Sequence, residues 1–212
     1  MEKEKIYAAI DHTVLKQTTT WQDVVRLCDQ AIAGGAASVC IPPSYVARAK
    51  EYVADKMAVC TVIGFPNGYQ TTLVKLVETK EALSAGADEI DVVVNLGDIK
   101  NGDWDLVQQE LAALKKACGK KVLKVIVECC YLTEEEKIKL CEMITALNID
   151  YIKTSTGFGS GGATIEDIEL FKQHIGPEVK IKAAGGIRDL AAAEQYLNLG
   201  VSRIGSSNIL NQ

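Results

Sequence analysis

Gly86-Ala-Asp-Glu-Ile-Asp91-Val begins with a glycine and runs directly into a β-rich segment. Three other stretches fit the same frame, with Gly or Asn in first place: Gly35-Ala-Ala-Ser-Val-Cys40-Ile, Asn148-Ile-Asp-Tyr-Ile-Lys153-Thr and Gly200-Val-Ser-Arg-Ile-Gly205-Ser. Gly and Asn are the residues that a helix C-terminus accepts in the left-handed conformation. The shared frame therefore predicts a repeated junction between a helix and the strand that follows it.

Short β-rich runs recur at regular intervals, at residues 7–11, 38–41, 59–65, 89–95, 122–128, 151–154, 179–183 and 203–205. The segments between them carry apolar residues at helical spacing, as at Val24, Leu27, Cys28 and Ile32. Strands that alternate with helices predict βα units and a parallel sheet. We therefore expect residues 1–212 to form a single α/β domain, a (β/α)8 TIM barrel, with a short last helix beginning within residues 208–212. An open doubly wound sheet is the alternative.

The composition excludes several classes of protein. The 23 basic and 28 acidic residues give a net charge of −5, and the basic residues form no patch that would bind nucleic acid. Every apolar run is far shorter than a membrane span, and the charged N-terminus differs from a signal peptide. We therefore expect a cytoplasmic protein with no membrane or nucleic-acid partner.

The cysteines and histidines give no metal-binding pattern. The seven cysteines include no CxxC pair, which predicts reduced thiols, several of them in the core. His12 and His174 lie in neither an HxH nor an HExxH motif. We therefore expect no metal site.

The sixth position of the shared frame holds Cys40, Asp91, Lys153 and Gly205. In a barrel the four stretches would form strands two, four, six and eight, and alternate strands fill one interior layer together. A thiol, a carboxylate and an amine are costly to bury in place of Val or Ile. This layer is therefore the candidate functional site.

Lys153 and Lys182 lie near the ends of neighbouring predicted strands. Lysines in such places often extend their amines to solvent. If both side chains point inward, strands roughly 5 Å apart bring the two charges together. Repulsion and desolvation then favour a neutral amine, which can attack a carbonyl and form a Schiff base. We weigh the two interpretations evenly.

Acidic residues could complete this site. Asp91 would orient an amine and move protons, or it would form only a buried ion pair. Asp11 either joins the same network or caps the turn that follows it. Lys124 and Glu128 share one face of the fifth run and are further members of a possible polar network. His12 has the opposite parity to Asp11 and is expected to pack behind the strand.

Glycines cluster after the last three predicted strands. Loops after strands seven and eight of a barrel often bind phosphate, and glycine lets backbone N–H groups approach the anion. We therefore predict a phosphate site, with Arg188 helping to neutralise the charge. Its members would be Gly157, Gly185, Gly186, Arg188, Gly205, Ser206 and Ser207.

With these motifs, the chain resembles the deoxyribose-phosphate aldolase family, whose members are class I aldolases with a (β/α)8 barrel. The most specific matches are Tyr151-Ile-Lys-Thr-Ser-Thr-Gly157 and Lys182-Ala-Ala-Gly-Gly-Ile-Arg188. Further matches are Asp11-His-Thr13, Ser38-Val-Cys-Ile41, Gly86-Ala-Asp-Glu-Ile-Asp-Val-Val93, Leu123-Lys-Val-Ile126 and Arg203-Ile-Gly-Ser-Ser207. The chain departs from the family in two places. Asn208 stands in place of a serine, and the sequence ends at Gln212 without the C-terminal tyrosine that many members carry.

The resemblance implies that Lys153 forms the Schiff base, that Lys182 lowers its pKa and that Asp91 donates and accepts protons. It implies reversible cleavage of 2-deoxy-D-ribose 5-phosphate into D-glyceraldehyde 3-phosphate and acetaldehyde, without a cofactor. Asp11, Cys40 and Lys124 are possible supporting residues. The expected partners are a small sugar phosphate, an aldehyde and further copies of the chain, in a homodimer or homotetramer.

Three other functions share some of these features. An aldolase or transaldolase for another sugar phosphate would use the same lysine. A metal-dependent epimerase or a phosphate-binding barrel without activity would share the glycine-rich loops. The paired lysines favour an aldolase over the last two.

Overall fold

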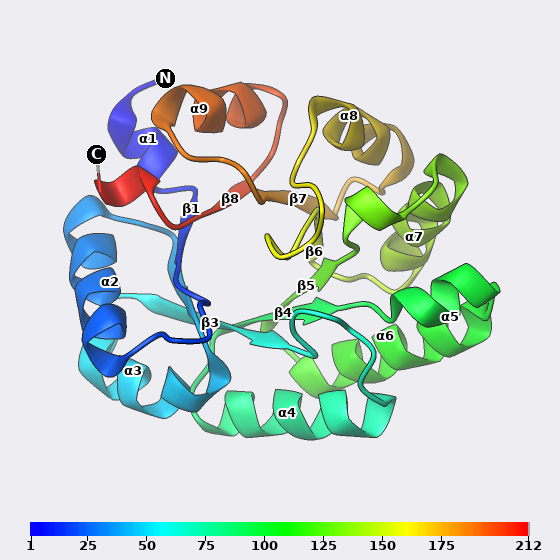
Figure 1. Cartoon of the computed structure of the whole chain (residues 1–212), viewed down its shortest axis with the longest axis horizontal. Helices are drawn as coiled ribbons and strands as arrows, with labels where there is room; N and C mark the ends of the chain where they lie inside the picture. Colours follow the sequence, from blue (N-terminus) through cyan, green and yellow to red (C-terminus); the bar gives the residue numbers. More distant parts are fainter. Residues whose placement is uncertain (212) are drawn as a thin grey trace.

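Eight short strands form a closed parallel barrel in the computed structural model, which describes residues 1–211 (Figure 1). Each strand pairs with its neighbours in the sequence, and the last strand pairs with the first. This closure confirms the predicted (β/α)8 barrel and excludes the open doubly wound sheet, which was the alternative. The strands are β1 (Ile10–Thr13), β2 (Ser38–Ile41), β3 (Ala58–Ile63), β4 (Glu89–Val93), β5 (Val122–Ile126), β6 (Tyr151–Lys153), β7 (Lys180–Ala184) and β8 (Arg203–Ser206).

Helices surround the barrel on its outer side (Figure 1). Several begin at a side chain that caps the first turn, and Thr20 and Thr133 each take part in a capping box. The α-helices are α1 (Lys3–Tyr7), α2 (Trp21–Gly34), α3 (Val46–Val53), α4 (Thr72–Ser84), α5 (Leu96–Asn101), α6 (Trp104–Cys118), α7 (Glu134–Ala146), α8 (Ile165–His174) and α9 (Leu190–Asn198). Short 3₁₀ helices are η1 (Pro43–Tyr45), η2 (Cys129–Tyr131) and η3 (Ile209–Asn211). Among these residues no helix has the length and apolar character needed to cross a membrane.

The boundaries of several elements differ from those predicted. A strand over residues 7–11 was wrong at its start, because Tyr7 ends α1 and β1 begins at Ile10. The fifth strand ends at Ile126, since Glu128 turns the backbone into the left-handed region with φ 55°. The last predicted helix is the 3₁₀ turn η3, and Gln212 lies outside the described residues.

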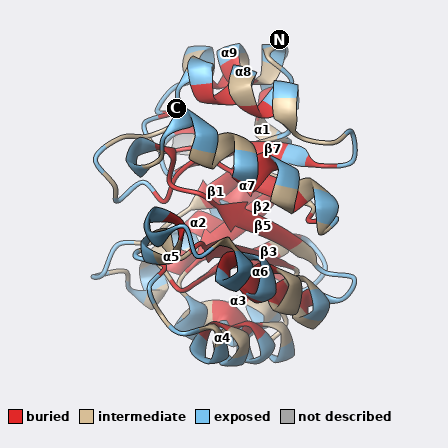
Figure 2. Cartoon of the chain, turned by 90° about the vertical axis from the view of Figure 1, so that its right-hand side faces the viewer, coloured by how far each residue is buried: buried red, intermediate tan, exposed pale blue. Residues whose placement is uncertain are grey.

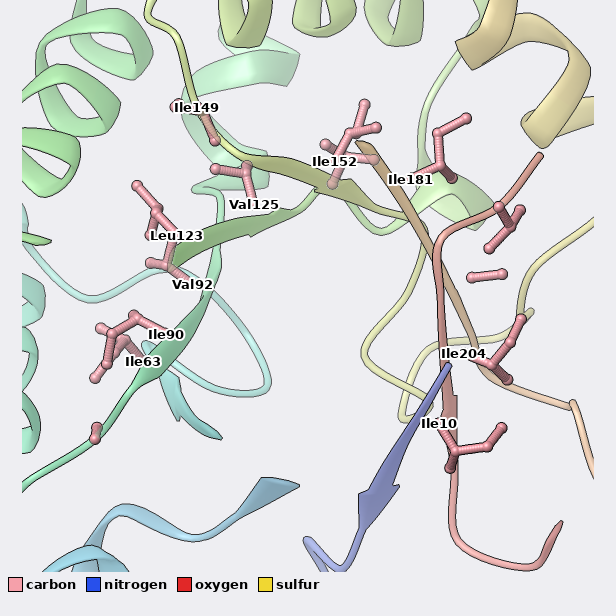
Figure 3. Close-up of a cluster of buried hydrophobic side chains, with 14 of the residues drawn as sticks. Ile10, Ile63, Ile90, Val92, Leu123, Val125, Ile149, Ile152, Ile181 and Ile204 are labelled. Atoms are coloured by element: carbon pink, nitrogen blue, oxygen red, sulfur yellow. The ribbon is translucent and has the colours of Figure 1, made fainter. Parts of the chain in front are cut away.

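Apolar strand side chains point outward, where the helices cover them. Figure 3 shows this cluster around Ile90, Val125, Ile152 and Ile204, and the strands form the buried centre in Figure 2. The alternate positions face the barrel interior, where a separate small cluster contains Cys40, Cys60 and Val62. The main apolar core therefore lies between the strands and the surrounding helices, and the barrel interior is available to polar groups.

Helix α4 buries polar side chains on the face that packs against the barrel. Lys75 is fully buried, and its Nζ donates to Glu110 Oε1 of α6 at 2.6 Å and to the Val93 carbonyl of β4 at 2.9 Å. Leu73 and Val77 of the same helix are instead 71% and 56% exposed. The Lys75–Glu110 pair therefore ties α4 to its neighbours in place of an apolar contact.

This pair should be strongly coupled in folding. Removing one partner of a buried ion pair leaves the other charge unpaired, so we expect Lys75→Met to lower the free energy of unfolding by about 3 kcal/mol. The double variant Lys75→Met/Glu110→Leu should recover most of that loss. Urea denaturation of the wild type, both single variants and the double variant measures the coupling. Losses that simply add would contradict it.

Candidate active site

Three buried lysines converge on the carboxylate of Asp91 inside the barrel. Asp91 Oδ2 accepts from Lys153 Nζ at 2.8 Å and from Lys182 Nζ at 2.7 Å. Its Oδ1 accepts from Lys124 Nζ at 2.8 Å and from Cys60 Sγ at 3.2 Å. Strand register explains the meeting, because Asp91 pairs with Lys124 across β4 and β5, and Lys153 pairs with Lys182 across β6 and β7.

A second carboxylate supports this cluster from β1. Asp11 Oδ2 lies 2.5 Å from Lys182 Nζ, and Asp11 Oδ1 accepts from Ser38 Oγ at 2.8 Å and from the Arg203 guanidinium. Of the two interpretations of Asp11, the structure therefore shows the network. Lys182 lies between the carboxylates of Asp11 and Asp91.

Glu89 and Arg203 extend the network toward the start of the strands. The Arg203 guanidinium donates to both carboxylate oxygens of Glu89, at 2.8 and 3.1 Å. The second oxygen of Glu89 also lies 2.6 Å from Lys124 Nζ. Glu89, Arg203 and Cys60 were not among the predicted site residues. Their parity, shared with Asp91 and Gly205, was the signal that could have identified Glu89 and Arg203.

The charges of the cluster shift the pKa values of its members. Burial by itself would raise the pKa of Asp91, but Lys124, Lys153 and Lys182 outweigh it and hold that pKa well below its usual value. Burial opposes the charge of Lys182, yet Asp11 and Asp91 raise the pKa of its amine above the usual value. The expectation that repulsion between the lysines governs the pair was therefore incomplete, because a carboxylate lies between them.

Lys153 connects this network to an open cavity of about 460 Å³. Of the three lysines that contact Asp91, Lys153 lines the cavity, whereas Lys124 and Lys182 are fully buried beneath it. The loops after β6, β7 and β8 form the rest of the wall. An amine that reaches both a carboxylate and a cavity can react with a bound carbonyl compound.

All seven residues predicted for the phosphate site line this same cavity: Gly157, Gly185, Gly186, Arg188, Gly205, Ser206 and Ser207. Gly185 and Gly186 have φ values of 85° and 82°, a backbone region that favours glycine. The hydroxyl of Ser206 donates to the Ile187 carbonyl at 2.8 Å, so this side chain also braces the loop after β7. Asn208, where the family often has serine, lines the cavity too.

Cys40 lies in the interior cluster beside Cys60 and does not line the cavity. The two thiols and a carboxylate oxygen of Asp91 lie within 4.8 Å of one another, a spacing that could suit a metal ion. However, Lys124 Nζ lies 3.3 Å from Cys60 Sγ, and lysine amines already contact both oxygens of Asp91. The positive charge around these donors opposes the binding of a cation.

The remaining predictions divide into two outcomes. His12 packs behind β1, where its Nε2 lies 3.0 Å from Gln30 Oε1 of α2, as expected. Glu128 does not join the barrel network, because its carboxylate accepts from the backbone N–H and hydroxyl of Thr156. The left-handed backbone at Glu128 removes it from the strand pattern on which the prediction rested.

Comparison with known proteins agrees with this geometry. A family model described as DeoC/LacD family aldolase matches residues 5–200. The deoxyribose-phosphate aldolase of Clostridioides difficile is 57% identical, over 96% of this chain and 93% of that protein. The corresponding protein of Streptococcus agalactiae serotype V is 53% identical, over 99% and 94%.

A solved structure shows the same fold. The deoxyribose phosphate aldolase from Aeropyrum pernix, described as tetrameric, superposes with a TM-score of 0.91 at 29% identity. The match covers 99% of this chain and 91% of that one. The barrel, its lysine cluster and these relatives agree, and the chain belongs to the DeoC/LacD family of aldolases.

Proposed function

We propose that the protein is a class I aldolase that reversibly cleaves 2-deoxy-D-ribose 5-phosphate into D-glyceraldehyde 3-phosphate and acetaldehyde. One observation carries the proposal: Lys153 both contacts Asp91 and lines the cavity that the glycine-rich loops enclose. The names of the relatives support the substrate. A cytoplasmic location stays a prediction from the sequence.

Substrate binding would use the two ends of the cavity. The phosphate would lie among backbone N–H groups of the loops after β6, β7 and β8, near Arg188. The aldehyde carbon of the open-chain sugar would then point down toward Lys153 Nζ. This orientation separates the anion from the buried charges of the barrel.

The chemistry would begin when the neutral amine of Lys153 attacks the aldehyde and forms a carbinolamine, which loses water to give the protonated imine. Removal of the proton from the C3 hydroxyl breaks the C2–C3 bond and releases D-glyceraldehyde 3-phosphate. The electron pair of that bond moves toward the imine nitrogen and leaves an enamine. Protonation of its carbon and hydrolysis release acetaldehyde and restore Lys153.

Asp91 and Lys182 would move the protons of these steps. Asp91 Oδ2 contacts both amines, so it can receive a proton from Lys153 and exchange one with Lys182. Lys182 is held between two carboxylates and keeps a positive charge beside the reacting nitrogen. Proton transfer of this kind contributes typically about 10² to 10⁴ in rate.

We also propose that the chain forms a homo-oligomer through the outer face of α4. The relative described as tetrameric supports self-association, and the exposed apolar side chains of α4 suggest the interface. Leu73, Val74 and Val77 are exposed there, and Leu106 of α6 and Tyr69 are also exposed and line one cavity together. Contiguous apolar patches of this kind commonly mark interaction sites. In an antiparallel pairing of two α4 helices about a two-fold axis, Leu73 of each copy would pack on Val77 of the other.

The Schiff base can be trapped directly. With acetaldehyde and borohydride, a reduced two-carbon adduct should form on Lys153 and be located by peptide mass mapping. Lys153→Arg should abolish both the adduct and the cleavage of 2-deoxy-D-ribose 5-phosphate, because the guanidinium is not a nucleophile. Lys180→Arg, a change at an exposed lysine of β7, serves as the control. An adduct on another lysine, or none on folded protein, would refute the mechanism.

The proposed interface can be tested by light scattering coupled to size-exclusion chromatography. Leu73→Glu/Val77→Glu should convert the oligomer into smaller species, since four glutamates would face one another across each two-fold contact. Gln173→Glu/Gln195→Glu adds the same charge on α8 and α9, on the opposite side of the barrel from α4 (Figure 1), and should leave the assembly unchanged. An unaltered mass for the α4 variant would place the interface elsewhere.

A further inference from the structure

Glu128 is a buried carboxylate that the proposed chemistry does not use. It lies just beyond β5, only 3% exposed, with φ 55° and ψ 64°. Few non-glycine residues adopt this conformation, and strained backbone of this kind concentrates at functional sites. Its side chain contacts Thr156, in the loop between β6 and α8.

The Glu128 carboxylate fixes the first turn of that loop. Its Oε1 accepts from the Thr156 backbone N–H at 3.0 Å, and its Oε2 accepts from the Thr156 hydroxyl. Thr156 Oγ1 in turn accepts from the backbone N–H of Phe158 at 3.0 Å. These bonds set the backbone on both sides of Gly157, whose φ is 85°.

The far side of the turn is also closely packed. The Phe158 ring meets Phe65 edge-to-face, with centroids 5.3 Å apart and planes at 87°. A Cβ on Gly159 would come within 3.2 Å of Glu128 Oε1. The turn is therefore held from below by Glu128 and from the side by Phe65.

This turn faces the loops that line the rest of the cavity. Thr156, Gly157 and Phe158 lie on the cavity wall together with Gly185 and Gly186. A Cβ on Gly185 would be 3.7 Å from the Gly157 Cα, so the two loops are in close contact. A shift of the turn by one ångström would change the distance from the Gly157 N–H to an anion bound between them.

We propose that Glu128 is a positioning residue that holds the 156–158 turn in place for the phosphate of the substrate. The proposal rests on the proposed function, because it requires a phosphorylated substrate in this cavity. Glu128 acts through Thr156 and contacts neither Lys153 nor Asp91 among the described interactions. Its loss should therefore weaken phosphate recognition and leave the chemistry at Lys153 intact.

Kinetics with phosphorylated and unphosphorylated substrate separate an effect on phosphate recognition from an effect on the chemistry at Lys153. For Glu128→Ala we expect the KM for 2-deoxy-D-ribose 5-phosphate to rise about tenfold, which corresponds to the loss of one modest binding contribution. The kcat/KM for unphosphorylated 2-deoxy-D-ribose and the rate of borohydride trapping with acetaldehyde should stay within twofold of the wild type. Glu142→Ala, at an exposed glutamate of α7, is the control.

Thr156 provides a second set of variants. Thr156→Val removes the hydroxyl and should raise the KM as Glu128→Ala does. Thr156→Ser keeps the hydroxyl and should leave the KM at the wild-type value. Equal losses on both substrates, or no change in the KM for the phosphorylated one, would overturn the proposal. A calorimetric titration with inorganic phosphate gives a readout without turnover, and Glu128→Ala should bind it more weakly.

The outcomes distinguish the two proposals. If the wild type forms no adduct at Lys153 but binds inorganic phosphate in a manner that depends on Glu128, the aldolase mechanism fails and the role of Glu128 stands. If the adduct forms and phosphate binding is indifferent to Glu128, the mechanism stands and the role of Glu128 fails.

Discussion

The shared carboxylate of Asp91 is the interaction on which the interior of this barrel depends. Lys124, Lys153 and Lys182 all reach it, and three ammonium groups could not stay buried together without a counter-charge. With Arg203, Asp11 and Glu89 included, the network holds four basic and three acidic groups. It becomes neutral when one lysine loses its proton, the form in which an amine attacks a carbonyl.

The barrel can hold a polar interior because apolar side chains on the outer faces of the strands, packed against the helices, stabilise the fold. Ile90 and Val92 of β4 pack under the helices, while Glu89 and Asp91 alternate with them and point inward. The strands hold the charged groups at fixed distances, and side chains on strands are more rigid than side chains on loops. The apolar layer and the reactive layer are therefore two sides of the same eight strands.

Sequence reasoning could predict which face each strand residue occupies, because side chains alternate with period two. It made Asp91, Lys124, Lys153 and Lys182 candidates for inward positions, with the two strand-end lysines weighed evenly against extension to solvent, and the structure places all four inside the barrel. The alternation does not tell the height of a residue in the barrel, which depends on how neighbouring strands are staggered. For that reason the contact of Arg203 with Glu89 and the position of Asp91 between two lysines became clear only from the register.

Loops obey different rules, and there the sequence was a weaker guide. Glycine clusters predicted an anion site, and the structure brings the glycines of these loops to the wall of one cavity, where backbone N–H groups can approach a ligand. The alternation along the fifth run predicted that Glu128 shares the inner face with Lys124. Its left-handed backbone instead ends the strand pattern, and its carboxylate bonds to Thr156. The proposed chemistry thus lies on strands and the proposed phosphate recognition on loops. Because Glu128 braces the 156–158 turn and contacts neither Lys153 nor Asp91 in the part of the chain that the structure describes, we expect substitutions there to alter phosphate binding and to leave the lysine cluster in place.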